Sequence, residues 1–465
     1  MSKLYLFGIG GTGSRVLRSF CMMMASGVHI NCDTIVPIII DPDHANADLT
    51  RTVVLLDNYS KIRSELDFPA GTQNDFFRPE FKRTLPNYTL YLRDTEDRPF
   101  KYFIGMPEMD SEDQAMMQML FSENNLDAMM DVGFKGNPNI GSVVLNQIVE
   151  SDEFLEFANS FEAGDKIFII SSIFGGTGAS GFPLLLKTLR TDKNIPNHSL
   201  INNAEIGAIT VLPYFTLNQD ENSEVDSATF ISKSKSALAY YEKNVSANGQ
   251  VNAIYYLADD VTGTYENHEG GADQQNQAHL IEFMSASAIV DFCNNSFVQG
   301  TTINKELGIN IEPETTTVSF SSFGDGLKTM LRLPLTQFTL MANCFADKYS
   351  EVSTLDFSHK FPNNFFKGEF MTKLKNFTLN YRDWLNEMKD NQRSLHLFKT
   401  ECGGKPFETV VNTTVYKVYS IKSNYELFFD RINRYKDKVH GTDPNKLLEI
   451  FFQATKQLCN EKYKF

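Results

Sequence analysis

The sequence feature that most constrains the fold of this chain is the stretch IFIISSIFGGTGASGFPLLLKTLR, residues Ile167 to Arg190. A short apolar run leads into a glycine-rich turn, and apolar residues then recur at helical spacing. A run that is apolar at nearly every position predicts a strand covered on both faces, which is typical of a parallel sheet. Ligands of such sheets bind beyond the carboxyl ends of the strands, so this turn is a candidate binding site.

Further apolar runs predict strands of the same kind. Helical patterns such as Ser14–Ala25 stand between the runs. The alternation of the two patterns predicts a doubly wound α/β fold with a parallel sheet. The five predicted strands are Leu4–Phe7, Ile35–Ile40, Lys166–Ser171, Ile206–Leu212 and Ala253–Leu257.

The rest of the chain departs from this alternation. We interpret residues 51–130, which are polar and rich in methionine, as a partly helical insertion in a first domain, 1–272. A long central helix is predicted over 273–298, and a divergent α+β domain over 299–465. In the C-terminal part, the strand-like segments are 315–323 and 407–421, and the helical segments are 333–350 and 444–461.

Length and charge narrow the function classes. The 465 residues suit two or three packed domains. A net charge of −15 repels the phosphates of nucleic acids and anionic lipids, so neither is an expected main partner. No run of about eighteen apolar residues occurs, so we expect no integral membrane segment. The six cysteines form no CxxC motif and the eight histidines show no metal-ligand spacing, which predicts reduced thiols, a cytoplasmic location and no zinc site.

Three glycine-rich turns stand at or near strand ends, at 8–14, 136–141 and 175–181. Glycine lets backbone N–H groups face an anion, and the following helix adds the positive end of its dipole. One such turn can equally be a tight connection without a ligand, whereas three in one α/β unit favour a bound phosphate group. The chain has no GxxxxGK[ST] sequence, which argues against an ordinary P-loop enzyme.

A dinucleotide-binding enzyme is an alternative interpretation. The segment TGASGF resembles the phosphate turn of sugar-nucleotide epimerases, but that turn belongs at the start of the chain and its last glycine is replaced here by Leu184. A Tyr-x-x-x-Lys pair with a suitable upstream serine is missing. Such an enzyme also needs an acidic residue about twenty positions after the first turn. Asp33 precedes the second strand, and Asp41 at its end could serve.

The order and spacing of these loops resemble the tubulin/FtsZ superfamily over roughly residues 1–297. FGGTGASG, residues 174–181, is similar to the family signature GGGTGxG, with Phe174 and Ser180 replacing glycines. KGNPNIG at 135–141 is similar to the family's GANPEVG, the turn at 8–14 to its GxGGGG, and DPDHAN at 41–46 to its NTDAQ loop. Four loops in the family's order make the resemblance specific and identify the chain as a divergent bacterial member.

The resemblance implies a bound guanine nucleotide, GTP or GDP, with Mg²⁺. Backbone N–H groups of the glycine turns would hold the phosphates, and the hydroxyls of Thr12 and Thr177 would contact phosphate or magnesium-bound water. Asp43 would hold the metal through water, and its alternative role is a helix N-cap. The residues expected to bind the nucleotide at these loops are Gly10, Gly11, Thr12, Gly13, Asp41, Asp43, Gly136, Asn137, Gly175, Gly176, Thr177 and Gly178.

Base contacts are implied further along the chain. Asp259 stands where the family has an Asn-Asp pair that contacts guanine, and its carboxylate can accept hydrogen bonds from guanine. Asn276 and Gln277, early in the predicted central helix, are the other candidates for base contact. The family's asparagine does not align cleanly there, so adenine stays open.

Ribose contacts are expected from acidic residues that follow Pro213-Tyr214-Phe215, a segment similar to the Pro-Phe turn of the family. Glu224 is the candidate, with Glu221 as its alternative. In the central helix, His279 and Glu282 lie one turn apart. They are either a functional pair or partners in a hydrogen bond on the helix face.

Hydrolysis in this superfamily is completed by the neighbouring subunit through a loop of the form N-x-D-x-x-[DE], which positions the attacking water. The nearest match gives Asn310, Glu312 and Glu314 as candidate catalytic residues. Glu314 comes one position early, and an acidic turn entering the segment 315–323 is the alternative. The resemblance implies a homo-oligomer or filament with GTPase activity. A nucleotide-binding sensor or scaffold that recruits partner proteins, for example in a bacterial defence system, without efficient hydrolysis, stays open.

Overall fold

The computed structural model describes most of the 465 residues. All six cysteines lie within the described residues and none forms a disulfide. None of the described helices is both long enough and apolar enough to cross a membrane. The described residues are 2–95, 98–130, 134, 137–217, 230–259, 263–265, 271, 275–307, 309, 316–417, 421–422 and 424–465.

A seven-stranded sheet organises the first 307 residues. Its strand order is β3-β2-β1-β4-β5-β7-β9, and every neighbouring pair is parallel. The five predicted strands are confirmed, whereas β3 and β9, at the two edges of the sheet, escaped prediction. The strands are β1 (Lys3–Ile9), β2 (Thr34–Ile40), β3 (Glu80–Phe81), β4 (Lys166–Ser172), β5 (Glu205–Val211), β7 (Ala253–Leu257) and β9 (Ile303–Glu306).

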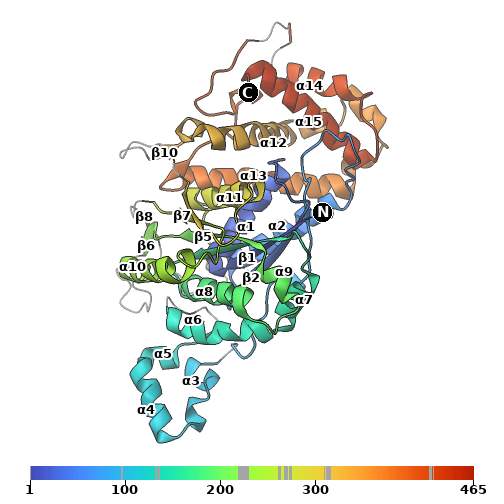
Figure 1. Cartoon of the computed structure of the whole chain (residues 1–465). Helices are drawn as coiled ribbons and strands as arrows, with labels where there is room; N and C mark the ends of the chain where they lie inside the picture. Colours follow the sequence, from blue (N-terminus) through green and yellow to red (C-terminus); the bar gives the residue numbers. More distant parts are fainter. Residues whose placement is uncertain are drawn as a thin grey trace.

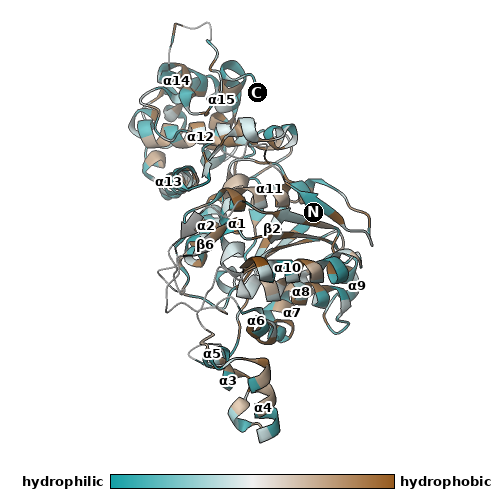
Figure 2. Cartoon of the chain, turned by 90° about the vertical axis from the view of Figure 1, so that its left-hand side faces the viewer, coloured by the Kyte–Doolittle hydropathy of each residue, from teal (hydrophilic) through white to brown (hydrophobic). Residues whose placement is uncertain are grey.

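Helices cover both faces of this sheet, so the predicted doubly wound α/β class is confirmed. One face carries α1, α2 and α11, and the other carries α8 with α6, α7, α9 and α10 (Figure 2). The helices are α1 (Gly10–Ala25), α2 (Ala47–Arg63), α6 (Pro138–Val144), α7 (Asp152–Ser160), α8 (Gly176–Thr191), α9 (His198–Asn202), α10 (Phe230–Tyr241) and α11 (Leu280–Asn294). The short strands β6 (Phe215–Leu217) and β8 (Gly263–Tyr265) pair with each other beyond the sheet.

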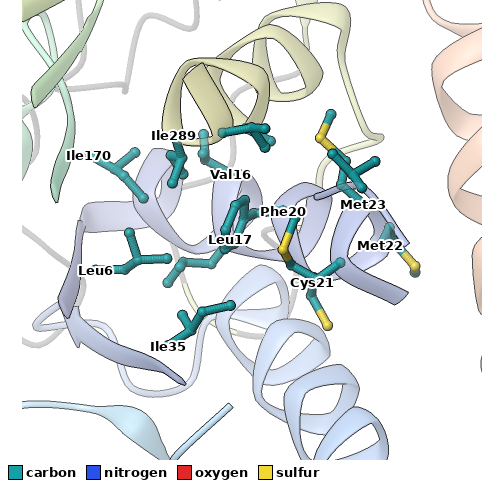
Figure 3. Packing of buried hydrophobic residues seen from close by; sticks show 14 of the residues in the cluster. Leu6, Val16, Leu17, Phe20, Cys21, Met22, Met23, Ile35, Ile170 and Ile289 are labelled. Carbon is teal, nitrogen blue, oxygen red and sulfur yellow. The ribbon is translucent and has the colours of Figure 1, made fainter. Parts of the chain in front are cut away.

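The centre of the core lies where α1 crosses the sheet. Leu6 and Ile170 from β1 and β4 lie close to Leu17 and Val16 of α1, and Ile289 of α11 closes the same cluster (Figure 3). All five side chains are buried. Continuous apolar burial on both faces of β1 and β4 holds the carboxyl ends of these strands, and the turns that follow them, in fixed positions.

The central helix is shorter than predicted. It begins at Leu280 rather than at 273 and ends at Asn294. The side chain of His279 accepts a hydrogen bond from Ile281 N, and Glu282 accepts one from the N–H of His279. This capping box sets the start of the helix, so Asn276 and Gln277 precede α11. The His279–Glu282 pair thus has a structural role as an N-terminal cap.

The predicted insertion at 51–130 consists of two different parts. Residues up to about 92 belong to the sheet domain, because α2 and β3 pack there and Tyr59 and Tyr88 are buried. Residues 98–130 project from the domain as a separate lobe (Figure 1). This lobe contains α3 (Phe100–Phe103), α4 (Ser111–Leu120) and α5 (Glu123–Asp127).

The C-terminal region is chiefly helical rather than α+β. The predicted helices at 333–350 and 444–461 are confirmed within α12 (Asp325–Val352) and α15 (Asp443–Lys462), and α13 (Glu369–Asp390) and α14 (Asn424–Tyr435) join them. At 315–323 the only described strand is β10 (Thr317–Val318), paired with β11 (Ser394–Leu395), because Ser319 caps a 3-10 turn. The predicted strand at 407–421 is wrong over its described residues: Pro406–Glu408 is a 3-10 turn, and pairing is limited to the bridge between Phe398 and Val410.

Helix α13 fixes the C-terminal region to the sheet domain. Glu387 receives two hydrogen bonds from the guanidinium of Arg18 at 2.7 and 2.9 Å. The indole N–H of Trp384 donates to the hydroxyl of Ser19 at 3.1 Å. The Trp384 ring also stacks on Phe283 of α11, with centroids 6.0 Å apart. Helix α13 therefore contacts both α1 and α11 directly.

Candidate functional site

The turn between β1 and α1 leaves helical N–H groups without a side-chain partner. Helix α1 starts at Gly10, with no side-chain cap and no acidic residue in its first turn. Gly10 has φ of 68°, and a Cβ on Gly13 would lie 2.3 Å from the carbonyl carbon of Gly8. Only glycine permits this tight turn. The structure thus places Gly10, Gly11, Thr12 and Gly13 in the first turn of the helix.

The turn between β4 and α8 repeats this arrangement. Gly175 is the N-cap and Gly176 the first residue of α8, again with no side-chain cap and no acid in the first turn. Thr177 and Gly178 follow within that turn. A Cβ on Gly10 would lie 3.5 Å from the Cβ of Thr177, so the two turns are direct neighbours. We call this pair of turns, 10–13 and 175–178, the glycine end of the site.

The third predicted loop also reaches this place. A Cβ on Gly141 of α6 would lie 2.3 Å from Ser180 Oγ and 3.0 Å from the carbonyl oxygen of Gly176. Asn137 is the N-cap of α6, but its N–H donates to the carbonyl of Phe134 at 2.7 Å, so it is not available to an anion as predicted. Gly136 lies outside the described residues.

Two buried carboxylates follow the neighbouring strand β2. Asp41 Oδ1 accepts from the N–H of Asp43 at 3.1 Å, and Asp43 accepts from Ala45 N at 3.2 Å and Gly271 N at 2.7 Å. Asn46, not Asp43, is the N-cap of α2. Burial, reinforced by the charge of Asp43, raises the pKa of Asp41 to about 7, although the hydrogen bond from the Asp43 N–H opposes this. In the described part of the chain neither carboxylate forms an ion pair.

The predicted base-contact residues are engaged within the chain. Asn276 donates through N and Nδ2 to Asp48 at 3.1 and 2.8 Å. Asp259 accepts two hydrogen bonds from the guanidinium of Arg393, at 2.9 and 2.7 Å. Gln277 is exposed. A base that binds Asn276 or Asp259 would compete with these internal partners.

A buried charge network borders this region. Arg15 of α1 donates to Glu282 at 2.7 Å, to Asp48 at 3.5 Å and to the hydroxyl of Tyr214 at 3.2 Å. Burial opposes its charge, but Tyr214, Glu282 and Asp48 together raise the pKa of Arg15. Arg51 adds a bond to Asp48 at 2.6 Å. We call this network, with the Asp259–Arg393 pair, the charged end of the site.

The two ends are adjacent, because a Cβ on Gly11 would lie 3.9 Å from Nη1 of Arg15. Arg15, Asp48 and Tyr214 were not predicted as site residues. The available signal was Arg15 and Arg18 at a three-residue step in the otherwise apolar helix SRVLRSFCMMMA. Burial lowers the pKa of His279 to about 4, so its ring is neutral and can accept the capping hydrogen bond.

Several predicted site residues cannot be placed. Asn310, Glu312 and Glu314, the candidate catalytic residues, lie outside the described residues, as do Glu221 and Glu224. Ile309, beside the catalytic candidates, forms a β-bridge with Phe323. These assignments stay predictions.

The described residues suit an anion better than a metal held by protein alone. They contain no cluster of three or more His, Cys, Asp or Glu side chains that could hold a metal ion. The glycine end offers two helix N-termini without a counter-charge, which is the chemistry of a phosphate cradle. Mg²⁺ commonly takes one or two carboxylates and completes its shell with phosphate oxygens and water, and Asp41 and Asp43 fit that role.

No protein-family model matches the sequence, and no curated protein matches it. Solved structures that resemble it include an empty FtsZ dimer from M. jannaschii at 14% identity and TM-score 0.27, covering 56% of this chain and 45% of that chain. CetZ2 from Haloferax volcanii, as a GTPγS-bound protofilament, matches at 16% identity and TM-score 0.30, covering 63% and 58%. CetZ1 from the same organism, as a GDP-bound monomer, matches at 15% and TM-score 0.31, covering 63% and 61%. The chain thus spans less than two thirds of the length of each of these proteins.

Proposed function

We propose that the chain is a tubulin/FtsZ-like nucleotide-binding protein whose glycine end holds the phosphates of GTP or GDP. The observation that carries the proposal is the pair of adjacent helix N-termini, α1 and α8, which have neither a side-chain cap nor an acid in their first turns. Helix ends that lack such partners need another source of hydrogen-bond acceptors, and phosphate oxygens supply them.

Five glycine-end residues have a direct role in this proposal. The N–H groups of Gly10, Gly11 and Thr12, with those of Gly176 and Thr177, would donate to phosphate oxygens. Asp43, supported by Asp41, would hold Mg²⁺ through water. The metal would neutralise phosphate charge when bound. Guanine would contact Asp259, Asn276 and Gln277 after Arg393 and Asp48 release the first two, and Glu224 would bind the ribose.

Self-association and hydrolysis form the finer part of the proposal. Asn310, Glu312 and Glu314 of one subunit would orient the attacking water beside the nucleotide of the next subunit. A site completed in this way makes turnover rise more steeply than linearly with protein concentration. If the Glu312→Ala variant loses this steep concentration dependence of GTP turnover, the result supports a site shared between two subunits.

The decisive experiment is a change of charge at the glycine end. Gly11 can accept a side chain, because its Cβ position has only Arg15 within 4 Å. An acid in the first turn of a helix favours the fold but repels phosphate. Gly11→Asp should therefore lower GTP affinity at least tenfold in calorimetry, while the neutral, similarly shaped Gly11→Asn keeps most of it. Equal binding by both variants, or a co-purified dinucleotide, contradicts the proposal.

A nucleotide-binding sensor or scaffold is the second candidate function. The projecting lobe at 98–130 favours it, because this lobe offers a surface to partners without taking part in the sheet (Figure 1). Nucleotide extraction from the purified protein, followed by GTP turnover at several protein concentrations, separates the two candidates. Bound GTP or GDP without turnover at any concentration supports the scaffold.

A further inference from the structure

The lobe at 98–130 is a small folded unit of its own. It projects from the sheet domain in both views of the molecule (Figures 1 and 2). The rings of Phe100 and Phe121 meet edge to face, with centroids 5.0 Å apart. Phe100, Leu126 and Met130 are buried. These residues form a small core between α3, α5 and Phe121, the residue that follows α4.

Helix α4 turns an apolar face away from that core. Met116, Met119 and Leu120 follow at three- and four-residue steps, which places them on one face of the helix. Met119 is 88% exposed, Leu120 60% and Met116 49%, and Tyr102 of α3 is 52% exposed. No residue of α4 is buried. A helix of ten residues is marginal alone in water, so covering this face would stabilise it.

Acidic side chains stand at the start of the same helix. Asp110 caps α4 by accepting from the N–H groups of Glu112 and Asp113 at 3.0 and 2.9 Å. Glu112 and Asp113 precede Met116 by four and three positions and so share its face. Among the residues that the structure describes, neither forms an ion pair. Residues 98–130 hold six acidic side chains against two basic ones.

We propose that the α4 face, defined by Glu112, Asp113, Met116, Met119 and Leu120, binds a basic amphipathic helix of a partner protein. Apolar side chains of the partner would cover the methionines, whose flexible thioethers adapt to varied shapes. Its lysines and arginines would pair with the acids, the pattern of helix-in-groove recognition. The α4 face of a second copy is a poorer occupant, because the acidic side chains of two such faces would repel each other.

The test uses the full chain and a labelled model peptide. An amphipathic Leu/Lys peptide of about twenty residues forms a helix long enough to span α4. Fluorescence anisotropy should show that it binds, and that the matching Leu/Glu peptide does not. The triple variant Met116→Ser, Met119→Ser, Leu120→Ser should weaken binding at least tenfold. Val298→Ser, at an exposed apolar position outside the lobe, is the matched control and should bind normally.

Two outcomes with the triple variant overturn the proposal. Unchanged binding by the triple variant means that overall negative charge, not the α4 face, attracts the peptide. A dimer seen by light scattering in the native chain and lost in the triple variant assigns the face to a second copy. Circular dichroism checks that the triple variant is folded. If the triple variant unfolds, the double variant Glu112→Gln, Asp113→Asn serves instead, because it keeps the apolar side chains. It should bind the peptide more weakly, and its binding should depend less on salt concentration. An unchanged salt dependence also contradicts the proposal.

Discussion

At the glycine end of the candidate site, the turns 10–13 and 175–178 present backbone N–H groups and no charged side chain. At the charged end, Arg15, Asp48 and Glu282 are buried and satisfy one another. The glycine end is thus ready for an anion that the protein does not supply. The charged end already contains its own counter-ions, and a ligand there would compete with them.

This difference bears on how the two halves of the molecule communicate. Glu387 of α13 pairs with Arg18 and Arg51, and it also accepts from the N–H of Ala278 at 2.8 Å. The segment before α11 is therefore tied to the C-terminal helices. Arg51 bonds both Asp48 and Glu387, so a ligand that displaced Arg51 would also remove a contact of α13.

Removal of Asp48 should have the largest effect on stability. Asp48→Ala leaves the buried guanidinium of Arg15 and the partly exposed one of Arg51 without this partner, and it removes the acceptor for Asn276. Breaking a buried ion pair costs about 3–5 kcal/mol of unfolding free energy. Chemical denaturation monitored by circular dichroism measures the loss. Asp57→Ala on the same helix, where the pair with Arg83 is largely exposed, should cost under about 1 kcal/mol. A similar cost for both would refute the distinct character of the charged end.

The carboxyl of Asp41 should make stability depend on pH. Its pKa rises from 3.8 to about 7 on folding, so the folded protein loses stability as pH rises from about 4 to 7. Asp41→Asn removes this loss and keeps an oxygen that can accept from Asp43 N. The variant should match the native protein near pH 4 and exceed it above pH 7 by up to about 4 kcal/mol. Thermal unfolding across this range provides the measurement, and an equal gain at both pH values would show that the carboxylate charge is not responsible.

The cap at the start of α11 should have the smallest effect. His279→Ala removes the side chain that accepts from Ile281 N, whereas His279→Asn keeps a good capping group. Both variants lose the contact with the Tyr214 ring, whose centroid lies 4.7 Å away. The difference in unfolding free energy between the two variants therefore reports the cap alone. Equilibrium denaturation should show that the Asn variant is more stable by about 1 kcal/mol. No difference would mean that Asp48 and Glu387, not the cap, fix the start of α11.

The pattern of apolar runs predicted the sheet core well. Runs such as Ile35–Ile40 are buried on both faces, and their composition alone indicates a parallel strand. The edge strands β3 and β9 escaped prediction because β3 has two residues and β9 reads INKE, which is mostly polar. The segment 407–421 misled in the opposite direction. Its β-branched residues favour a strand, but its described residues pair only through the bridge at Val410.

What the sequence determined by itself was therefore local: five strands, the glycine turns after β1 and β4, and the helical patterns of α12 and α15. A glycine turn needs only its own backbone conformation, which neighbouring residues set. The tertiary structure alone decided the charged end, because Arg15, Asp48 and Glu282 come from three separate helices, α1, α2 and α11. It also decided that Asn276 precedes α11 and that residues 98–130 form a projecting lobe, since both depend on which distant side chains are near enough to bind.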